Sequence, residues 1–340
     1  MSNKRLSKKE YLRLFTRSNL LEIGHQAHEM RNKMADPRTV TFIIDRNINY
    51  TNICVSGCSF CAFWRTQDNK DNYLLDKRTI FKKIEETIKL GGTQILMQGG
   101  LHPVLKLNYY TELLKSIKAK FKIHIHSFSP PEIIHIARVS KLSPREVLQA
   151  LKEAGLDSLP GGGAEILVDR VRNRLSPNKC TSDEWLNVMR ESHELGLRTT
   201  ATMMFGHIET PKDRIEHLIK IRKLQDETGG FTAFIPWTYQ PQNTLLGGIT
   251  SGGHDYLKTL AISRLMLDNI PNIQASWVTQ GPKIGQIALF FGANDLGSTM
   301  IEENVVRSAG TSYTMTREEI VRLIKDSGFK PKQRETSIYE

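Results

Sequence analysis

Long apolar segments are absent from this sequence of 340 residues. It contains no run of about 18 apolar residues, the length needed to cross a bilayer, and its start, MSNKRLSKKE, lacks the apolar core of a signal peptide. Hydrophobic residues make up 39% and charged residues 24%, which excludes a disordered or collagen-like chain. We therefore expect a globular cytoplasmic protein with no membrane insertion.

Acidic residues are fewer than basic ones. Lys and Arg number 47 against 36 Asp and Glu, a formal net charge of +11. This balance favours anionic partners, but it does not choose among nucleic acid, a membrane surface and a small anionic substrate. The basic residues are scattered along the chain instead of forming a stripe, so we expect no nucleic acid partner.

Cysteine is also scarce, and its placement is informative. Of four cysteines, Cys54, Cys58 and Cys61 fall within eight residues, and Cys180 stands alone. A disulfide framework would spread its cysteines along the chain, so the group predicts metal ligands. Three thiolates spaced C-x3-C-x2-C in one loop can hold three corners of a 4Fe–4S cluster and leave the fourth iron open. Structural zinc, with Cys180 or a histidine as fourth ligand, and packed thiols without metal are the alternatives.

Short apolar runs alternate with longer amphipathic segments, which predicts a parallel sheet. Eight strands over about 250 residues match an α/β fold of the (β/α)8 TIM-barrel type, with a doubly wound open sheet as the alternative. The expected strands are Thr41–Ile44, Gln94–Gln98, Ile123–Phe128, Ser158–Pro160, Thr199–Phe205, Phe231–Trp237, Ile273–Val278 and Ile287–Phe291. The expected helices are Lys77–Leu90, Tyr109–Lys120, Ser143–Ala154, Ser182–Leu195, Pro211–Glu227, Asp255–Asn269 and Thr316–Lys325.

These elements divide the chain into three parts. Residues 1–36 form an N-terminal helical extension that ends at Asp36-Pro37, residues 37–300 form the barrel, and residues 301–340 form a C-terminal helical segment and tail. The active site of a (β/α)8 barrel lies at the C-terminal ends of its strands. Here almost every expected strand is followed by glycines and polar side chains, so we expect a site at that end.

The cysteine loop resembles the signature of the radical S-adenosylmethionine (SAM) superfamily, C-x3-C-x-aromatic-C after the first barrel strand. Phe60 occupies the aromatic position. The resemblance implies a 4Fe–4S cluster on Cys54, Cys58 and Cys61, with the open iron bound by the amino and carboxylate groups of SAM. Reduction of the cluster then cleaves SAM and yields a 5′-deoxyadenosyl radical.

Two further features fit the cofactor site of that superfamily. Gln98-Gly99-Gly100 follows the second expected strand, where glycines allow the backbone to approach a ligand closely. Glu165 follows the fourth, where a carboxylate would accept hydrogen bonds from the ribose of SAM; the other interpretation is the first turn of a helix. The resemblance therefore implies SAM contacts at Phe60, Gln98, Gly99, Gly100 and Glu165.

Longer stretches resemble the menaquinone (futalosine pathway) and deazaflavin branch of the superfamily. They are Gly161–Leu167, Thr200–Glu209, Gln225–Pro241, Asn272–Gly281 and Phe291–Ser298. The likeness is greatest to the enzymes that convert dehypoxanthine futalosine to its cyclic form, in which the radical removes the C4′ hydrogen of the sugar and the carbon radical closes onto the benzoate ring. Formation of aminofutalosine or of a deazaflavin is the alternative within the branch. A non-catalytic module stapled by zinc is the alternative outside it.

For this reaction we expect His207 and Glu209 to be catalytic. The expected substrate-binding residues are His126, Trp237, Tyr239, Trp277, Gln280 and Asp295. Arg65, Arg170 and Arg198 are candidates for the benzoate carboxylate, and the sequence does not choose among them. The expected partners are this anionic small molecule and a low-potential electron donor such as flavodoxin or ferredoxin.

Overall fold

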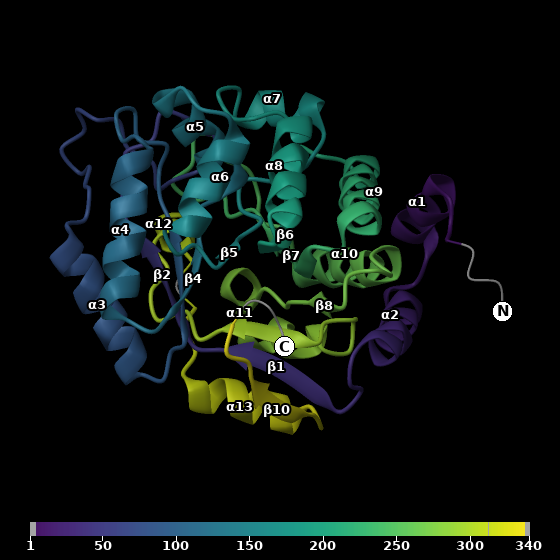
Figure 1. Cartoon of the computed structure of the whole chain (residues 1–340). Helices are drawn as coiled ribbons and strands as arrows, with labels where there is room; N and C mark the ends of the chain where they lie inside the picture. Colours follow the sequence, from purple (N-terminus) through teal and green to yellow (C-terminus); the bar gives the residue numbers. More distant parts are fainter. Residues whose placement is uncertain (1–4, 312, 337–340) are drawn as a thin grey trace.

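Seven parallel strands form the centre of the molecule (Figure 1). The structure is a computed structural model that describes residues 5–311 and 313–336. The strands pair in chain order. They are β2 (Asp45–Asn49), β3 (Gln94–Gln98), β4 (His124–Ser127), β5 (Ser158–Leu159), β6 (Arg198–Phe205), β7 (Phe231–Thr238) and β8 (Asn272–Ile273). Buried apolar side chains such as Ile95, Ile125 and Phe234 form the core between these strands and the surrounding helices.

Two further strands close this sheet into a ring. β1 (Thr39–Ile43) continues into β2 after Ile44 alone, and β9 (Asp295–Ser298) pairs in parallel with β1. On its other side β9 meets the residue after β8 through a parallel bridge between Gln274 and Asp295. Because β1 and β2 form one interrupted strand, the pairings join eight strand positions in a ring. The predicted (β/α)8 TIM-type fold is therefore confirmed.

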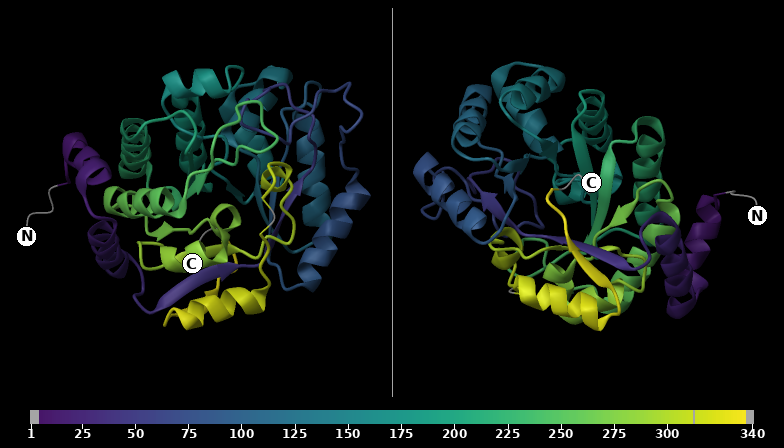
Figure 2. Two further views of the ribbon diagram at one scale, coloured as in Figure 1. Left: turned by 180° about the vertical axis from the view of Figure 1, so that it is seen from behind. Right: turned by 60° about the horizontal axis from the view of Figure 1, so that its bottom comes forward.

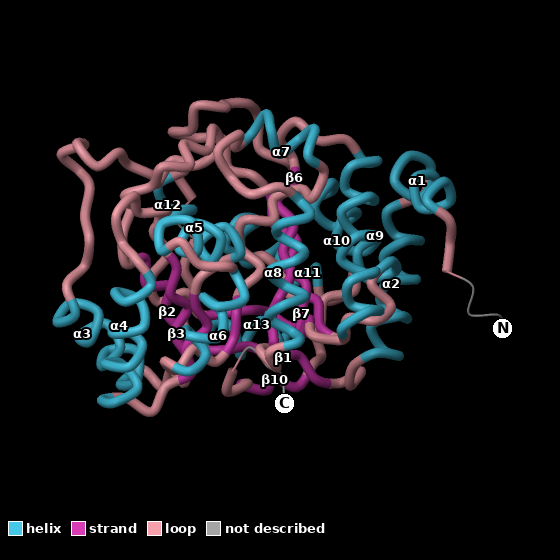
Figure 3. Tube along the Cα trace, turned by 45° about the horizontal axis from the view of Figure 1, so that its top comes forward, coloured by secondary structure: helices cyan, strands magenta, loops and turns pink. Residues whose placement is uncertain are grey.

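Helices surround these strands (Figure 3). They are α1 (Lys8–Arg17), α2 (Leu20–Met34), α3 (Lys77–Lys89), α4 (Leu107–Lys120), α5 (Pro130–Ser140), α6 (Pro144–Glu153), α7 (Asp169–Leu175), α8 (Ser182–Glu194), α9 (Pro211–Thr228), α10 (Gly253–Met266), α11 (Trp277–Ala288), α12 (Val305–Ser308) and α13 (Arg317–Asp326). Capping boxes begin several of them, for example Thr210 with Asp213 at α9. The N-terminal helices α1 and α2 pack against α9 and α10, on the outside of the barrel.

The last two predicted strands are the part of the fold that sequence reasoning placed wrongly. Residues of the expected strand Ile287–Phe291 lie at the end of α11 and in the turn after it, and β8 covers only Asn272–Ile273 of its region. The eighth strand position belongs instead to β9, whose sequence is Asp-Leu-Gly-Ser. A four-residue strand with two polar residues and a glycine has no apolar run that would indicate a strand in the sequence. It is recognised only from its pairings with β1 and with Gln274.

The C-terminal segment adds a strand outside the ring. β10 (Lys330–Gln333) pairs in parallel with β1, and Figure 2 shows the two strands side by side. The Arg334 backbone N–H donates to the carbonyl of Phe42, which carries the contact one residue further. Residues 1–4 of the predicted N-terminal extension lie outside the described residues, as do residues 312 and 337–340 of the predicted C-terminal segment. Within the described chain, no helix is long and apolar enough to span a bilayer.

Candidate active site

The barrel encloses a cavity of about 280 Å³. Its wall includes five of the side chains predicted for the site: Gln98, His126, Glu165, Trp237 and Trp277. A smaller cavity of about 40 Å³ adjoins it at the C-terminal ends of the strands and shares Trp237, Val305 and Val306 with it. This smaller cavity is lined by three more predicted residues, Phe60, Cys61 and Tyr239. The cysteine loop and the barrel interior thus lie on either side of the same three side chains.

The backbone of the cysteine loop is fixed by its neighbours. The N–H of Cys54 donates to the carbonyl of Arg65 (3.0 Å), and that of Ser59 donates to Leu175 at the end of α7 (2.9 Å). The Trp64 indole N–H donates to the carbonyl of Cys58 (3.2 Å). All four cysteines are free, and burial raises the pKa of the Cys54 and Cys61 thiols. The loop therefore presents three unoxidised thiols on a rigid support.

Among the described residues, no three His, Cys, Asp or Glu side chains are grouped as ligands of a single metal ion. A single zinc ion would draw its sulfur ligands to about 2.3 Å from one centre. Ligands at three corners of a cubane stand further apart, because each binds a different iron. Three thiolates from one loop are the donor set that a 4Fe–4S cluster with one open iron would need.

A buried ion cluster lies beside this loop. Lys179 Nζ donates to Glu165 Oε1 (3.0 Å) and stands 5.3 Å from the centre of the Phe60 ring. Burial alone would lower the pKa of Lys179, but Cys58 and Glu165 raise it above its ordinary value. Arg172 Nη1 is 3.6 Å from Glu165 Oε2, and this buried oxygen accepts no hydrogen bond from the residues that the structure describes. A buried carboxylate oxygen in the cavity wall without a donor fits a hydroxyl-bearing ligand.

The backbone of Glu165 is also unusual. Its φ is +42°, in the left-handed region that non-glycine residues rarely adopt. The backbone N–H of Met204 on β6 donates to the Glu165 carbonyl (3.0 Å), so a neighbouring strand holds this conformation. Strain that the surrounding structure maintains is concentrated at functional sites. The strained backbone therefore supports a functional role for Glu165, in the loop that follows β5.

The turn Gly99-Gly100 packs tightly against the start of the cysteine loop. A Cβ atom on Gly99 would lie 2.5 Å from the Tyr50 ring, and one on Gly100 would overlap the carbonyl oxygen of Ile53. The Gly99 N–H donates to Glu132 Oε1 (3.0 Å), and Tyr50 donates its hydroxyl to the same oxygen (2.7 Å). Both glycines are therefore required by this packing.

Glu132 begins α5 and was not predicted from the sequence. Ser129 donates its hydroxyl to Glu132 Oε2 (2.6 Å), in addition to the bonds from Gly99 and Tyr50. Complete burial raises the pKa of this carboxyl to about 7. The side chain connects the glycine turn to α5. Its only sequence signal is Ser129-Pro-Pro-Glu132, which fits the start of a helix.

His207 and Glu209 lie outside both cavities. Their side chains pair at 2.9 Å, and Arg214 contacts the same carboxylate at 2.8 Å. Glu209 also accepts from the backbone N–H groups of Gly206 and His207. Although burial alone would raise the pKa of Glu209, His207 and Arg214 lower it. This arrangement holds the loop after β6 and engages both side chains in contacts with one another and with Arg214.

Two of the predicted substrate residues also lie apart from the cavities. Asp295 is fully buried and pairs with Arg334 (2.9 Å), and it accepts the hydroxyl proton of Thr41 (2.6 Å). Gln280 Nε2 donates to the Thr238 hydroxyl at the end of β7 (2.6 Å). Asp295 thus contacts the barrel cavity indirectly, because its partner Arg334 lines that cavity. Arg334 is the only Lys or Arg in the described part of the cavity wall, and it was not predicted.

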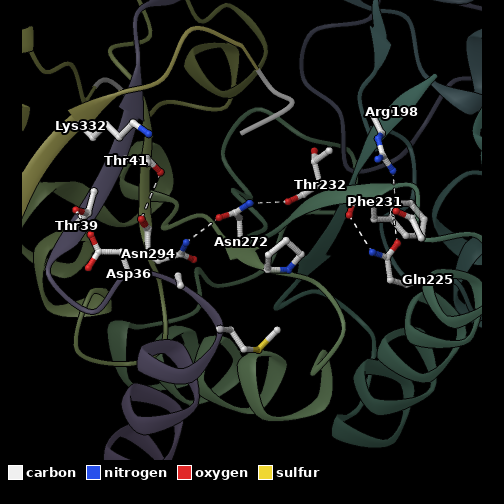
Figure 4. A pocket seen from close by; sticks show the side chains of 14 residues that line it. Asp36, Thr39, Thr41, Arg198, Gln225, Phe231, Thr232, Asn272, Asn294 and Lys332 are labelled. Atoms are coloured by element: carbon white, nitrogen blue, oxygen red, sulfur yellow. Dashed lines mark hydrogen bonds between the residues drawn. The ribbon is translucent and has the colours of Figure 1, made fainter. Parts of the chain in front are cut away.

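None of the three arginines considered for the substrate carboxylate lines the barrel cavity. Arg65 Nη1 donates to carbonyl groups within its own loop, and Arg170 pairs with Asp213 on the surface. Arg198 lines a separate cavity of about 490 Å³ at the N-terminal ends of the strands (Figure 4). There the polar groups bond within the wall, as Asn272 does with the Thr232 carbonyl (2.9 Å).

This fold and site place the chain in a known class. Residues 48–221 match the radical SAM superfamily and residues 228–340 match the CofH/MqnC C-terminal region. The chain belongs to the radical SAM superfamily and is an enzyme, and this family uses a 4Fe–4S cluster and SAM. Cyclic dehypoxanthine futalosine synthase of Halalkalibacterium halodurans is 49% identical over 99% of this chain and 92% of its own. The protein of that name from Streptomyces coelicolor is 45% identical over 98% and 85%.

Archaeal relatives are nearly as similar under another name. The 5-amino-6-(D-ribitylamino)uracil–L-tyrosine 4-hydroxyphenyl transferase of Archaeoglobus fulgidus is 45% identical over 94% of this chain and 93% of its own. Among solved structures, the FeFe-hydrogenase maturase HydG of Carboxydothermus hydrogenoformans superposes with a TM-score of 0.78 at 18% identity, over 96% and 76% of the two chains. Methylornithine synthase (PylB) gives 0.69 at 19%, over 98% and 96%. These structures support the fold.

Proposed function

We propose that this enzyme converts dehypoxanthine futalosine to cyclic dehypoxanthine futalosine, a step of menaquinone biosynthesis. The observation that carries this proposal is 49% identity over 99% of the chain to a protein with that name. The barrel cavity agrees with the substrate, because two tryptophans line it and, among the described residues, Arg334 is its one Lys or Arg. The runner-up is the tyrosine-dependent transferase reaction, which the archaeal relatives at 45% identity favour.

Three groups of residues would hold the cofactors. Cys54, Cys58 and Cys61 would bind the cluster, and the backbone of Gly99 and Gly100 would approach SAM beside it. Glu165 Oε2, which lacks a hydrogen-bond donor, would accept from the ribose hydroxyls of SAM. When bound, these cofactors supply a 5′-deoxyadenosyl radical that removes hydrogen from the substrate.

The rest of the cavity would orient the substrate. Trp237 and Trp277 offer flat faces for the arene, and Arg334 offers a cation for the benzoate carboxylate. Asp295 fixes the guanidinium from the other side at 2.9 Å. These side chains would hold C4′ of the sugar close to the arene carbon that it attacks, which is how a rigid cavity accelerates ring closure. A low-potential donor such as flavodoxin or ferredoxin would supply the electron.

The proposal is tested by an anaerobic assay of the reconstituted, reduced enzyme with SAM. One reaction contains dehypoxanthine futalosine, and a parallel one contains L-tyrosine with 5-amino-6-(D-ribitylamino)uracil. We expect 5′-deoxyadenosine in the first reaction, together with a product lighter than the substrate by two hydrogen atoms. Consumption of tyrosine and the uracil with an unchanged futalosine would overturn the proposal in favour of the transferase.

A further inference from the structure

Two histidines and a serine form a hydrogen-bonded chain that leads away from the cavity. His126 Nδ1 and Ser158 Oγ are 2.7 Å apart, and His124 Nε2 and the same Oγ are also 2.7 Å apart. His124 and His126 are two positions apart on β4 and therefore share one face of the strand. Ser158 stands opposite His126 in the register of β4 and β5. One hydroxyl thus bridges two imidazoles.

The two ends of this chain lie in different spaces. His126 lines the barrel cavity, and because its bond to Ser158 uses Nδ1, Nε2 is the ring nitrogen left to act on a ligand. His124 lines an open surface cavity of about 680 Å³ at the N-terminal ends of the strands, together with Lys118 and Asp157. The imidazole–hydroxyl–imidazole chain is therefore a continuous route from the substrate space to the solvent.

The proposed reaction needs a route of this kind. After the sugar radical adds to the arene, the ring regains aromaticity by losing one electron and one proton. The carboxylates of the cavity wall have other partners: Lys179 donates to Glu165 Oε1, Ser298 and Gln94 donate to Asp45, and Asn47 and two backbone N–H groups donate to Glu303. The second oxygen of Glu165 is the one proposed above to accept from the ribose of SAM. An unprotonated imidazole nitrogen facing the cavity is better placed to act as the base.

The charges around the chain favour transfer outward. Burial, followed by His124 and Arg334, lowers the pKa of His126, so it is neutral at pH 7 and unstable once protonated. Burial also lowers the pKa of His124, but Asp157 opposes this shift while Lys118 adds to it. The cation is therefore better tolerated at His124, beside a carboxylate and solvent, than at His126 beside Arg334.

We propose that His126 is the base that removes the proton from the cyclised arene, and that Ser158 and His124 conduct it to solvent. Nε2 of His126 accepts the proton from carbon while its Nδ1 proton passes to Ser158 Oγ. The Ser158 hydroxyl proton passes to His124 Nε2, and the Nδ1 proton of His124 passes to water. The electron goes to a one-electron acceptor of the iron–sulfur class. The chemical role of the chain rests on the proposed function.

The first experiment measures how much cyclic product forms per 5′-deoxyadenosine, which separates deprotonation from hydrogen abstraction. His126→Gln should lower this ratio about 100-fold, within the range for loss of a general base, and Ser158→Ala about tenfold. Ser158→Thr keeps the hydroxyl and should restore the ratio. Ser127→Ala is the matched control, because that hydroxyl donates only to the Met97 carbonyl (2.6 Å). An unchanged ratio in His126→Gln would overturn the proposal.

The second experiment does not depend on the substrate. Nitrogen-15 NMR of the histidine-labelled holoenzyme should show His126 and His124 neutral at pH 7, each with its proton on Nδ1, and Ser158→Ala should shift both signals. The relay would be overturned, whichever substrate is used, by a His126 proton on Nε2 or by histidine signals that do not shift in Ser158→Ala. If instead the parent enzyme forms 5′-deoxyadenosine without cyclic product while the NMR result holds, the proposed function fails and the relay stands.

Discussion

At the scale of single residues, the two buried glutamates of the site differ in what surrounds them. Glu165 has two cations nearby, Lys179 at 3.0 Å and Arg172 at 3.6 Å, and it keeps one oxygen without a donor. Glu132 has hydrogen bonds from Gly99, Tyr50 and Ser129, and within the described part of the chain it forms no ion pair. Because of this difference, Glu165 is suited to bind a ligand, whereas Glu132 is suited to hold the glycine turn in place.

The raised pKa of Glu132 predicts a pH dependence of stability. Between its ordinary pKa of 4.5 and about 7, the folded state holds a proton that the unfolded state has released, so stability falls as pH rises through this window. The full loss is on the order of 3 kcal/mol. Glu132→Gln cannot titrate, so its free energy of unfolding relative to the parent should improve steadily from pH 5 to pH 8. Urea titrations of both proteins at each pH check this, and parallel curves would contradict it.

The cysteines give a second prediction at this scale. Cys54→Ser, Cys58→Ser and Cys61→Ser should each lose most of the bound iron and all cleavage of SAM, because three thiolates are needed to hold the cluster. Cys180→Ser is the matched control and should keep both, since Arg172 bonds mainly to the Cys180 carbonyl (2.7 Å) and only weakly to its thiol (3.6 Å). Iron analysis and 5′-deoxyadenosine formation are the measurements. Loss of iron in Cys180→Ser would mean a fourth protein ligand.

At the scale of elements, helices with clear periodicity and glycine stops were predicted well. Glycines with positive φ follow α3 at Gly91, α6 at Gly155 and α8 at Gly196. Helices α5 and α7 were missed, because each is an additional helix between a strand and the helix that was predicted to follow that strand. α11 was read as strand at both ends, since its apolar residues are split by the non-helical Gly281 and by Pro282.

The candidate site shows the same limit. The sequence indicates the cysteines, the glycine pair and Glu165, because each belongs to a short local motif. Three other residues of the site belong to no such motif: Lys179, Glu132 and Arg334. Each contacts a residue that lies elsewhere in the chain, namely Glu165, Gly99 and Asp295 in that order. Conversely, His207 and Glu209 look catalytic by type and spacing, yet the structure pairs them with Arg214.

The contact between the glycine turn and the cysteine loop gives a prediction for two elements together. In Gly100→Ala the new Cβ would overlap the Ile53 carbonyl oxygen and come within 2.9 Å of Cys54 Cβ. Backbone atoms cannot move aside independently, so we expect the cysteine loop to shift, with a loss of about 1–3 kcal/mol in stability and more than half of the iron. Gly252→Ala is the control, because a Cβ there meets nothing within 4 Å. Unchanged iron in Gly100→Ala would contradict this.

At the scale of the whole molecule, residues far apart in the chain complete the barrel. β9 connects the last strand of the sheet to the first, and β10 lies outside β1. The same C-terminal segment carries Arg334 into the cavity wall, where it pairs with Asp295 of β9. One ion pair therefore joins the C-terminal segment to β9 and holds a cation in the cavity wall. The N-terminal helices, in contrast, pack against α9 and α10 on the outside of the barrel.

A double substitution separates these two roles of Arg334. Arg334→Met alone leaves Asp295 as a buried charge without its cation, which should cost about 3–5 kcal/mol of stability. Arg334→Met with Asp295→Asn removes both charges and should recover most of that loss, because Asn can still accept from the Gly297 N–H (2.8 Å). The KM for dehypoxanthine futalosine should stay at least tenfold raised in both variants, since a hydrogen-bonded charge contributes roughly 1.5–3 kcal/mol. Recovery of KM together with stability in the double variant would mean that Arg334 only supports the fold.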